Sequence, residues 1–366
     1  MSQENSGPSA SKVNKGIQQP SPVNNEAAKK FIQRKKKLIT LEEFTEGILS
    51  GDRIILSRAI TLIESSLPKH FKLAQKIIER CIHYSGNSVR IGITGVPGVG
   101  KSTFIESFGK YLTGIGRKIA VLAIDPSSEI SRGSILGDKT RMEELSNDPK
   151  AFIRPSPSAG TIGGVARKTR ESIILCEAAG FDTILVETVG VGQSETAVSI
   201  MVDFFLLLML AGAGDELQGI KRGIMEMADA IVINKADKEN VQNAQNAKRD
   251  YQNALHLFPP AASGWIPRVE TCSSIANDGI EEVWKMVNDY ISFTNQNGYF
   301  DLKRRSQAKS RMYETINEKL KDEFYRNPKV SKLLPTIEKD LMSQKRSSYS
   351  AAQKLLDVYF KSLREK

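Results

Sequence analysis

A glycine-rich segment of nine residues constrains the fold of this chain more than any other feature. An apolar run, 91–94, precedes it and reads as a buried strand, and a helix-compatible run, 104–112, follows it. Backbone N–H groups of such a loop turn inward around a polyphosphate at a helix N-terminus, where the helix dipole favours negative charge. The segment fits the pattern G-x-x-x-x-G-K-[ST] and consists of Gly95, Val96, Pro97, Gly98, Val99, Gly100, Lys101, Ser102 and Thr103.

This pattern predicts a phosphate-binding loop with distinct roles for its last polar residues. The Lys101 ammonium is expected to contact the β- and γ-phosphates of a nucleotide, and the Ser102 hydroxyl is expected to bind Mg²⁺. A glycine-rich turn that binds nothing is the competing interpretation. The strand before the loop and the helix after it favour the phosphate-binding one.

Short apolar runs alternate with helix-compatible segments over most of the chain. Near-continuous Val, Ile and Leu runs separated by helices favour an α/β fold with a mostly parallel sheet and helices on both faces. In such sheets ligands bind beyond the carboxyl ends of the strands. The fold class expected is therefore that of a P-loop NTPase. The predicted strands are 90–94, 119–124, 152–154, 183–187, 204–210, 230–234 and 268–272.

Four segments are expected along the chain. Residues 1–37 are rich in Ser, Asn, Gln and Pro with few large apolar groups, which predicts a disordered basic tail. The segment 38–88 is expected to be helical, with helices near 40–49, 52–65 and 69–84. The nucleotide-binding domain then covers 89–285. A charged helical segment, 286–366, follows it and is expected to be interrupted at Pro328 and Pro335.

The net charge of +10 is concentrated at the two ends of the chain. Residues 1–37 carry eight basic and two acidic side chains, and residues 301–366 carry seventeen and nine, which leaves 38–300 with a net charge of −4. Solvated tails explain this distribution better than a nucleic-acid partner does, because no aromatic platform or nucleic-acid motif accompanies the charge. No apolar stretch is long enough to span a membrane. Three dispersed cysteines favour a reduced, cytoplasmic protein over a secreted one, and a mitochondrial matrix protein is the weaker alternative.

Three carboxylates are expected beside the phosphate-binding loop. Asp125 ends the second predicted strand, Asp138 lies in the loop after it, and Glu187 ends the fourth strand. Carboxylates at neighbouring strand ends can hold Mg²⁺ directly or through its waters. Each of the three could instead be a helix cap or a surface charge. Their position after apolar strands favours a role in metal binding and hydrolysis.

A second motif predicts that the base of the nucleotide is guanine. Asn234, Lys235 and Asp237 fit N-K-x-D directly after an apolar strand. The Asp237 carboxylate can accept hydrogen bonds from N1–H and the exocyclic N2–H₂ of guanine, which adenine lacks. A site built on such hydrogen bonds can reject the other base by about 10⁴–10⁵-fold. Residues after the last strand are expected to contact the guanine oxygen through a backbone amide; these are Ser273, Ser274 and Ile275. The expected ligands are therefore GTP, GDP and Mg²⁺.

Two glycine-rich loops are candidates for parts that respond to the γ-phosphate. Gly190, Gly192 and Gln193 follow Glu187, and Gln193 is a candidate for orienting the attacking water. A loop residue with no catalytic role is the other interpretation of Gln193. The charged, glycine-dense stretch 211–223 could be a switch or a long connection between a strand and a helix.

Taken together, these motifs resemble those of the ArgK/MeaB family of P-loop GTPases over about residues 40–366. The run E-T-V-G-V-G-Q-S-E at 187–195 is the most specific part of the resemblance. The resemblance implies a homodimeric GTPase that acts as chaperone of an adenosylcobalamin-dependent mutase on a separate chain, usually methylmalonyl-CoA mutase. In that family GTP binding and hydrolysis gate cofactor loading and protect or rescue the mutase.

The resemblance also implies roles for particular residues. Lys101 and Ser102 would serve phosphate and Mg²⁺, and Asp125, Asp138 and Glu187 would serve metal and hydrolysis. The C-terminal helices would form a dimerisation arm. The loop 212–223 would contact the mutase, with Asp215, Glu216, Gln218 and Lys221 as candidates.

Three other functions fit parts of the sequence. An ATP-dependent kinase linked to transport of basic amino acids is disfavoured by Asp237, which has no matching donor on adenine. A nickel or zinc metallochaperone would need a cluster of soft or imidazole ligands, and the three cysteines and three histidines are scattered along the chain. A scaffold that binds GTP without hydrolysing it is the third alternative.

Overall fold

The computed structural model describes residues 39–364 except 66, 126–141, 158–161, 189–192 and 213–217. The chain divides into two compact units, 1–40 and 41–366. The expected tail, 1–37, lies outside the described residues. The architecture below is that of the second unit, in which the described helices include none that is both long and apolar enough to cross a membrane.

The second unit begins with helices whose apolar faces are buried. Asp52 caps the second of them by accepting hydrogen bonds from the backbone N–H groups of Ile54 and Ile55 at 2.7 and 3.1 Å, a contribution of about 1 kcal/mol. Pro68 occupies the first turn of the third, where a missing N–H costs nothing. These elements are α2 (Leu41–Leu49), α3 (Arg53–Glu64), α4 (Pro68–Cys81) and the 3₁₀ turn η1 (Ile82–Tyr84).

The centre of the unit is a seven-stranded parallel sheet with the order β3-β2-β4-β1-β5-β6-β7. All seven predicted strands are present, which confirms the α/β fold class. The inner strands are buried along nearly their whole length, as expected for a sheet covered on both faces. The strands are β1 (Val89–Gly95), β2 (Ile119–Asp125), β3 (Ala151–Pro157), β4 (Thr183–Thr188), β5 (Phe204–Leu210), β6 (Ala230–Asn234) and β7 (Arg268–Thr271).

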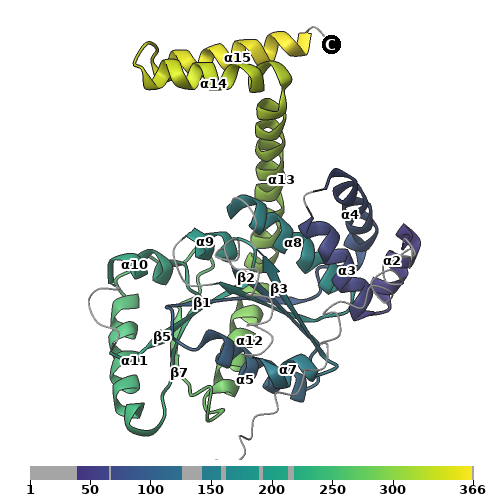
Figure 1. The fold of residues 1–366 in the computed structure, drawn as a ribbon. Helices are drawn as coiled ribbons and strands as arrows, with labels where there is room; N and C mark the ends of the chain where they lie inside the picture. The colour runs from purple at the N-terminus through teal and green to yellow at the C-terminus, as the bar shows by residue number, and fades with distance from the viewer. Residues whose placement is uncertain are drawn as a thin grey trace, which may run out of the picture. The chain divides into compact units, whose positions relative to one another are not determined.

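Helices cover both faces of the sheet (Figure 1). One face packs on α5 and α12 through a large apolar cluster that includes Phe104, Phe108 and Trp284. On the other face, α10 and α11 pack on β5 and β6 through Met225 and Ala244. The helices of this region are α5 (Lys101–Gly114), α7 (Glu143–Asn147), α8 (Ile162–Ala178), α9 (Gln193–Ser199), α10 (Gln218–Met227), η3 (Lys238–Asn240), α11 (Val241–Leu255) and α12 (Ile280–Gln296).

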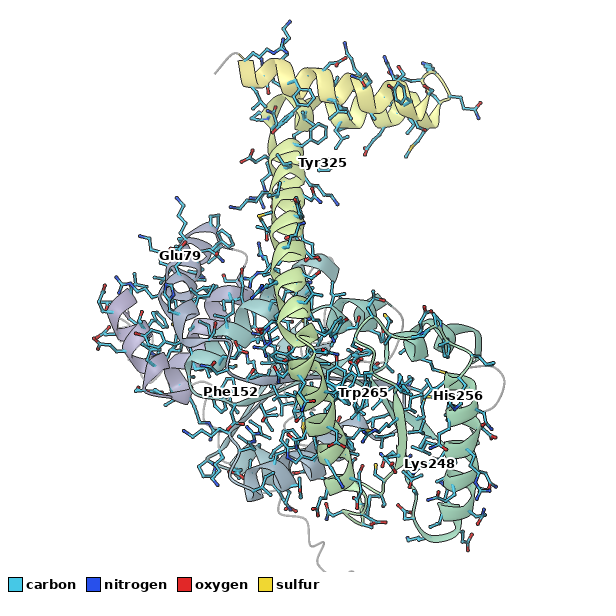
Figure 2. The ribbon with its side chains drawn as sticks, turned by 180° about the vertical axis from the view of Figure 1, so that it is seen from behind. Glu79, Phe152, Lys248, His256, Trp265 and Tyr325 are labelled. Atoms are coloured by element: carbon cyan, nitrogen blue, oxygen red, sulfur yellow. The ribbon has the colours of Figure 1, made fainter. Side chains whose placement is uncertain are left out.

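The chain ends in three helices: α13 (Tyr299–Arg326), α14 (Pro328–Met342) and α15 (Ser348–Arg364). The first turns of α13 are held by charge, because the Arg304 guanidinium donates to both carboxylate oxygens of buried Asp203 at 2.8 and 2.7 Å. At the far end of α13, near Tyr325 in Figure 2, α14 and α15 form a small apolar cluster of their own around Val330 and Ile337.

One expectation about these helices is wrong. Pro335 does not interrupt the helix, because it lies inside α14, which begins at Pro328. A proline within a helix costs about 3 kcal/mol through the lost hydrogen bond and the ring clash. Packing of α14 against α15 through Val330 and Ile337 offsets that cost. Pro328 does mark a boundary, since Asn327 ends α13 and caps α14 with its side chain.

Candidate functional site

The phosphate-binding loop connects β1 to α5 at the carboxyl edge of the sheet, as the motif predicts. Two glycines are required by geometry. A side chain on Gly95 would lie 2.5 Å from the Leu208 carbonyl oxygen of the neighbouring strand. Gly100 precedes α5 with φ +89°, and a Cβ there would press on the Asn234 amide at 3.1 Å. The loop can therefore approach β5 and the 234–237 segment as closely as it does only with glycine at these positions.

Lys101 extends back over this loop. Its ammonium donates to the carbonyl oxygens of Gly95 at 2.8 Å and Val96 at 3.3 Å. Burial lowers the pKa of Lys101, and the negative charges of Glu187 and Glu195 oppose that shift. The loop thus holds a half-buried cation whose compensating charges come from β4 and α9.

The carboxyl end of β4 lies directly beside the loop. The Ser102 hydroxyl is 3.3 Å from Glu187 Oε1, and Glu187 is only 9% exposed. The Thr188 hydroxyl donates to that of Thr94 at 2.9 Å, which links the ends of β4 and β1. A hydroxyl and a carboxylate oxygen thus meet next to the lysine, and these are ligand types that suit a hard cation such as Mg²⁺.

Asn234 connects the two predicted motifs. Its amide nitrogen donates to the Val99 carbonyl of the phosphate-binding loop at 2.9 Å. Its Oδ1 accepts from the backbone N–H and the hydroxyl of Ser274, at 3.2 and 2.8 Å. Because Asn234 is buried, one side chain fixes the phosphate-binding loop to the segment after β7.

Lys235 and Asp237 line the same edge. The Lys235 ammonium donates to the Gly98 carbonyl at 2.9 Å, so its aliphatic part crosses the phosphate-binding loop. Lys235 has φ +60°, and the Asn240 side chain stabilises this left-handed conformation by donating to the Lys235 carbonyl at 2.7 Å. The Asp237 carboxylate accepts a hydrogen bond from the Ser273 hydroxyl at 2.5 Å. Ile275, by contrast, directs its side chain to solvent and is 79% exposed.

Several predicted site residues cannot be placed with the others. Asp125 ends β2, which is adjacent to β4, but its side chain lies outside the described part of the structure. The same holds for Gln193, the first residue of α9. Asp138 lies wholly outside the described residues. Of the proposed partner contacts, Asp215 and Glu216 also lie outside them, whereas Gln218 and Lys221 are placed in α10 by backbone only.

Sequence reasoning missed two residues of the site. Glu195 is fully buried, and its charge acts on Lys101; its only signal was its place at the end of the 187–195 run. Asn240 holds the backbone of Lys235, and no motif marks it. Within the described residues no group of three or more His, Cys, Asp and Glu side chains could hold a metal ion.

Comparisons with known proteins identify a family of GTPases with which a guanine nucleotide site of this kind agrees. The model of the family described as "Methylmalonyl Co-A mutase-associated GTPase MeaB" matches residues 56–329. The chain is 46% identical over 288 residues to GTPase ArgK of Escherichia coli K12, and this alignment covers 79% of this chain and 87% of the relative. It is 44% identical over 323 residues to the "Methylmalonic aciduria type A homolog, mitochondrial" of Mus musculus, with 86% and 78% covered. A crystal structure entitled "LAO/AO transport system kinase" has a TM-score of 0.70 at 36% identity, with 88% and 99% covered.

Proposed function

Because this chain belongs to the MeaB family of GTPases, we propose that its GTP hydrolysis serves as a chaperone step for an adenosylcobalamin-dependent mutase on a separate chain. The mutase would be methylmalonyl-CoA mutase, and hydrolysis would gate loading of its cofactor and protect or reactivate it. The family description and the name of the mouse relative support this assignment. The observation that carries the GTP-binding part of the proposal is the Asn234 side chain, which joins the phosphate-binding loop to Ser274 in the segment after β7.

Guanine recognition is assigned to Asp237 in this proposal. Its carboxylate now accepts from the Ser273 hydroxyl, and it would accept from N1–H and N2–H₂ of guanine. Lys235 would cover one face of the base with its aliphatic part. Among Ser273, Ser274 and Ile275, the backbone amide for the guanine oxygen would come from Ile275, because the N–H groups of the two serines donate to the Asp278 carbonyl and to Asn234 Oδ1.

On the phosphate side of the site, the residues would promote hydrolysis by positioning the reacting groups and neutralising their charge. Lys101 would exchange its carbonyl contacts for β- and γ-phosphate oxygens. Ser102 and Glu187 fit Mg²⁺ by the chemistry of their oxygens, and Asp125 and Asp138 are proposed to complete its surroundings. Mg²⁺ bound there would neutralise the charge that develops on the phosphates. Gln193 is proposed to orient the attacking water in line with the bond that breaks.

The proposal includes a second copy of the chain as partner. Helix α13 exposes an apolar stripe along one face that includes Leu302, Tyr313 and Leu320. An unpartnered stripe of this kind on a long helix is typical of a helix–helix interface. Helices α13–α15 would therefore form a dimerisation arm. The mutase would contact the nucleotide-responsive segment that holds Asp215, Glu216, Gln218 and Lys221.

The decisive experiment measures phosphate release from GTP and from ATP, with and without methylmalonyl-CoA mutase. We expect slow release from GTP that the mutase accelerates, and no comparable release from ATP. A Glu187→Gln variant should retain GDP affinity and lose the acceleration. Equal use of GTP and ATP would overturn the guanine assignment. Acceleration by an unrelated protein to the same extent as by the mutase would overturn the chaperone role.

A further inference from the structure

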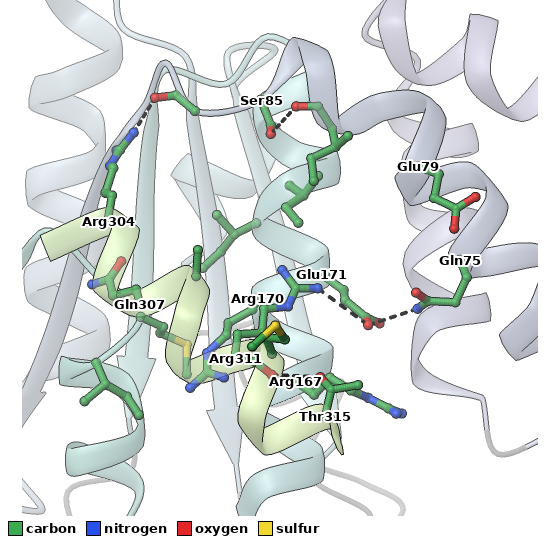
Figure 3. A pocket seen from close by; sticks show the side chains of 18 of the residues that line it. Gln75, Glu79, Ser85, Arg167, Arg170, Glu171, Arg304, Gln307, Arg311 and Thr315 are labelled. Carbon is green, nitrogen blue, oxygen red and sulfur yellow. Dashed lines mark hydrogen bonds and ion pairs between the residues drawn. The ribbon is translucent and has the colours of Figure 1, made fainter. Parts of the chain in front are cut away.

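A cavity of about 840 Å³ lies between α4, α8 and α13, and Figure 3 shows it from close by. Its walls come from the faces of these helices, from the amino-terminal end of β1 and from Ile200 and Met201 after α9. They include no residue of the phosphate-binding loop or of the 234–237 segment. A volume in this range is typical of sites for small organic ligands.

The walls of this cavity combine apolar surface with positive charge. Ile173 and Ile174 on α8 and Met312 and Ile316 on α13 provide aliphatic surface. Five arginines and one lysine also line the cavity, against two carboxylates. Three of these arginines are neutralised by carboxylates around them: Arg90 pairs with Glu177, Arg170 with Glu314 and Arg304 with Asp203.

The other two arginines, Arg167 and Arg311, share a single carboxylate, that of Glu171. Arg311 Nη2 lies 3.7 Å from Glu171 Oε1, and the same carboxylate also accepts from Gln75 at 3.0 Å (Figure 3). Burial lowers the pKa of Arg311, and Arg170 and other nearby arginines lower it further, whereas Glu171 raises it. A half-buried guanidinium among several other arginines favours an additional anion.

Arg167 is the most distinctive side chain in the cavity. Its guanidinium lies 5.2 Å from the centre of the Phe71 ring, which holds it in place. Its Nε is buried, and within the described structure this atom has no hydrogen-bond partner. A buried donor of this kind costs free energy unless an acceptor reaches it.

We propose that this cavity binds an amphipathic organic anion. A phosphate or carboxylate group would pair with Arg167 and Arg311, because a guanidinium can bind two oxygens of such a group at once. An apolar body would lie against Ile173, Ile174 and Met312. A second copy of the chain fits less well, since its segment 327–366 carries nine basic and four acidic side chains and would meet like charge here.

The test is calorimetric titration of the full chain saturated with GDP and Mg²⁺, so that the nucleotide site is filled. The probes are hexyl phosphate, hexanoate, inorganic phosphate and hexyltrimethylammonium. We expect the two amphipathic anions to bind more tightly than inorganic phosphate, and the cation with the same chain not to bind. The tighter of hexyl phosphate and hexanoate identifies the anionic group.

Two variants connect this binding to the cavity. Arg167→Gln should weaken hexyl phosphate binding about tenfold or more while GDP affinity is retained. Arg268→Gln is the matched control, because Arg268 also lies over an aromatic ring, that of Trp265, but outside the cavity. Equal binding of the anion and the cation, or no effect of Arg167→Gln, would overturn the proposal. Binding that is lost as the chain dimerises would assign the cavity to a second copy and overturn it as well.

Discussion

At the scale of single residues, the site depends on a few side chains that each form hydrogen bonds with two segments of the chain. Asn234 is the clearest case, because its amide serves the phosphate-binding loop and its carbonyl oxygen serves Ser274. The N-K-x-D motif predicted that Asn234 belongs to the site, but not which two segments its side chain contacts. The role of Asn240 could not be predicted, because it depends on the left-handed backbone conformation of Lys235, and no local sequence pattern indicates that conformation.

Asp237→Asn should change the choice of base. The variant loses a charged acceptor for the two guanine donors, so GDP affinity should fall about 10- to 100-fold. The affinity for xanthosine diphosphate should rise relative to that for GDP, because the new amide can donate a hydrogen bond to the oxygen at C2 of xanthine. Competition against a fluorescent nucleotide measures both. Asp250→Asn, at an exposed position on α11, is the control, and a similar loss there would contradict the assignment.

The cysteines should be inert in the folded protein. Burial raises the pKa of Cys81 to about 11 and that of Cys272 to about 12, although a hydrogen bond with Ser274 opposes the second shift. Only the thiolate reacts, so Cys81 should react at least about 100-fold more slowly with iodoacetamide at pH 8 than an ordinary thiol. Mass spectrometry before and after unfolding in urea checks this. Alkylation of the native protein at the unfolded rate would refute it.

At the scale of elements, the sequence was sufficient to predict a strand or helix wherever the element depends on a local pattern of residues. All seven strands could be predicted, because each is a short apolar run bounded by polar residues. Pro335 is the counterexample, since packing between α14 and α15 overrides its local preference. The cavity between α4, α8 and α13 could not be predicted either. Its lining comes from residues 71–319, and only the fold brings them together.

The attachment of α13 depends on a buried ion pair. The Asp203 side chain is 1% exposed and that of Arg304 is 16% exposed. Arg304→Met should therefore destabilise the protein by about 3–5 kcal/mol, because it leaves Asp203 buried without its counter-ion. Urea unfolding measures the change. Arg326→Met, which removes an exposed pair with Asp322, should cost less than about 1 kcal/mol; equal effects would show that the Asp203 pair is not an anchor.

At the scale of the whole molecule, the apolar stripe on α13 predicts the oligomeric state. Leu320→Asp should convert a dimer to a monomer, because it places a charge within the proposed interface. Sedimentation velocity at several protein concentrations measures this. Lys321→Asp introduces the same side chain at an exposed position away from the stripe and should leave the dimer intact. A monomer for both the unmodified chain and the variant would remove the dimerisation arm from the proposal.

Strand β1 has a consequence for how the two ends of the molecule communicate. Arg304 of α13 donates to the Ser88 carbonyl just before β1 at 2.6 Å, and β1 leaves the sheet seven residues later as the phosphate-binding loop. A force applied to the C-terminal helices therefore reaches the phosphate-binding loop along one extended strand, without passing through another loop. We expect GDP release to quicken in Arg304→Met, and unchanged release would show that the strand does not transmit strain.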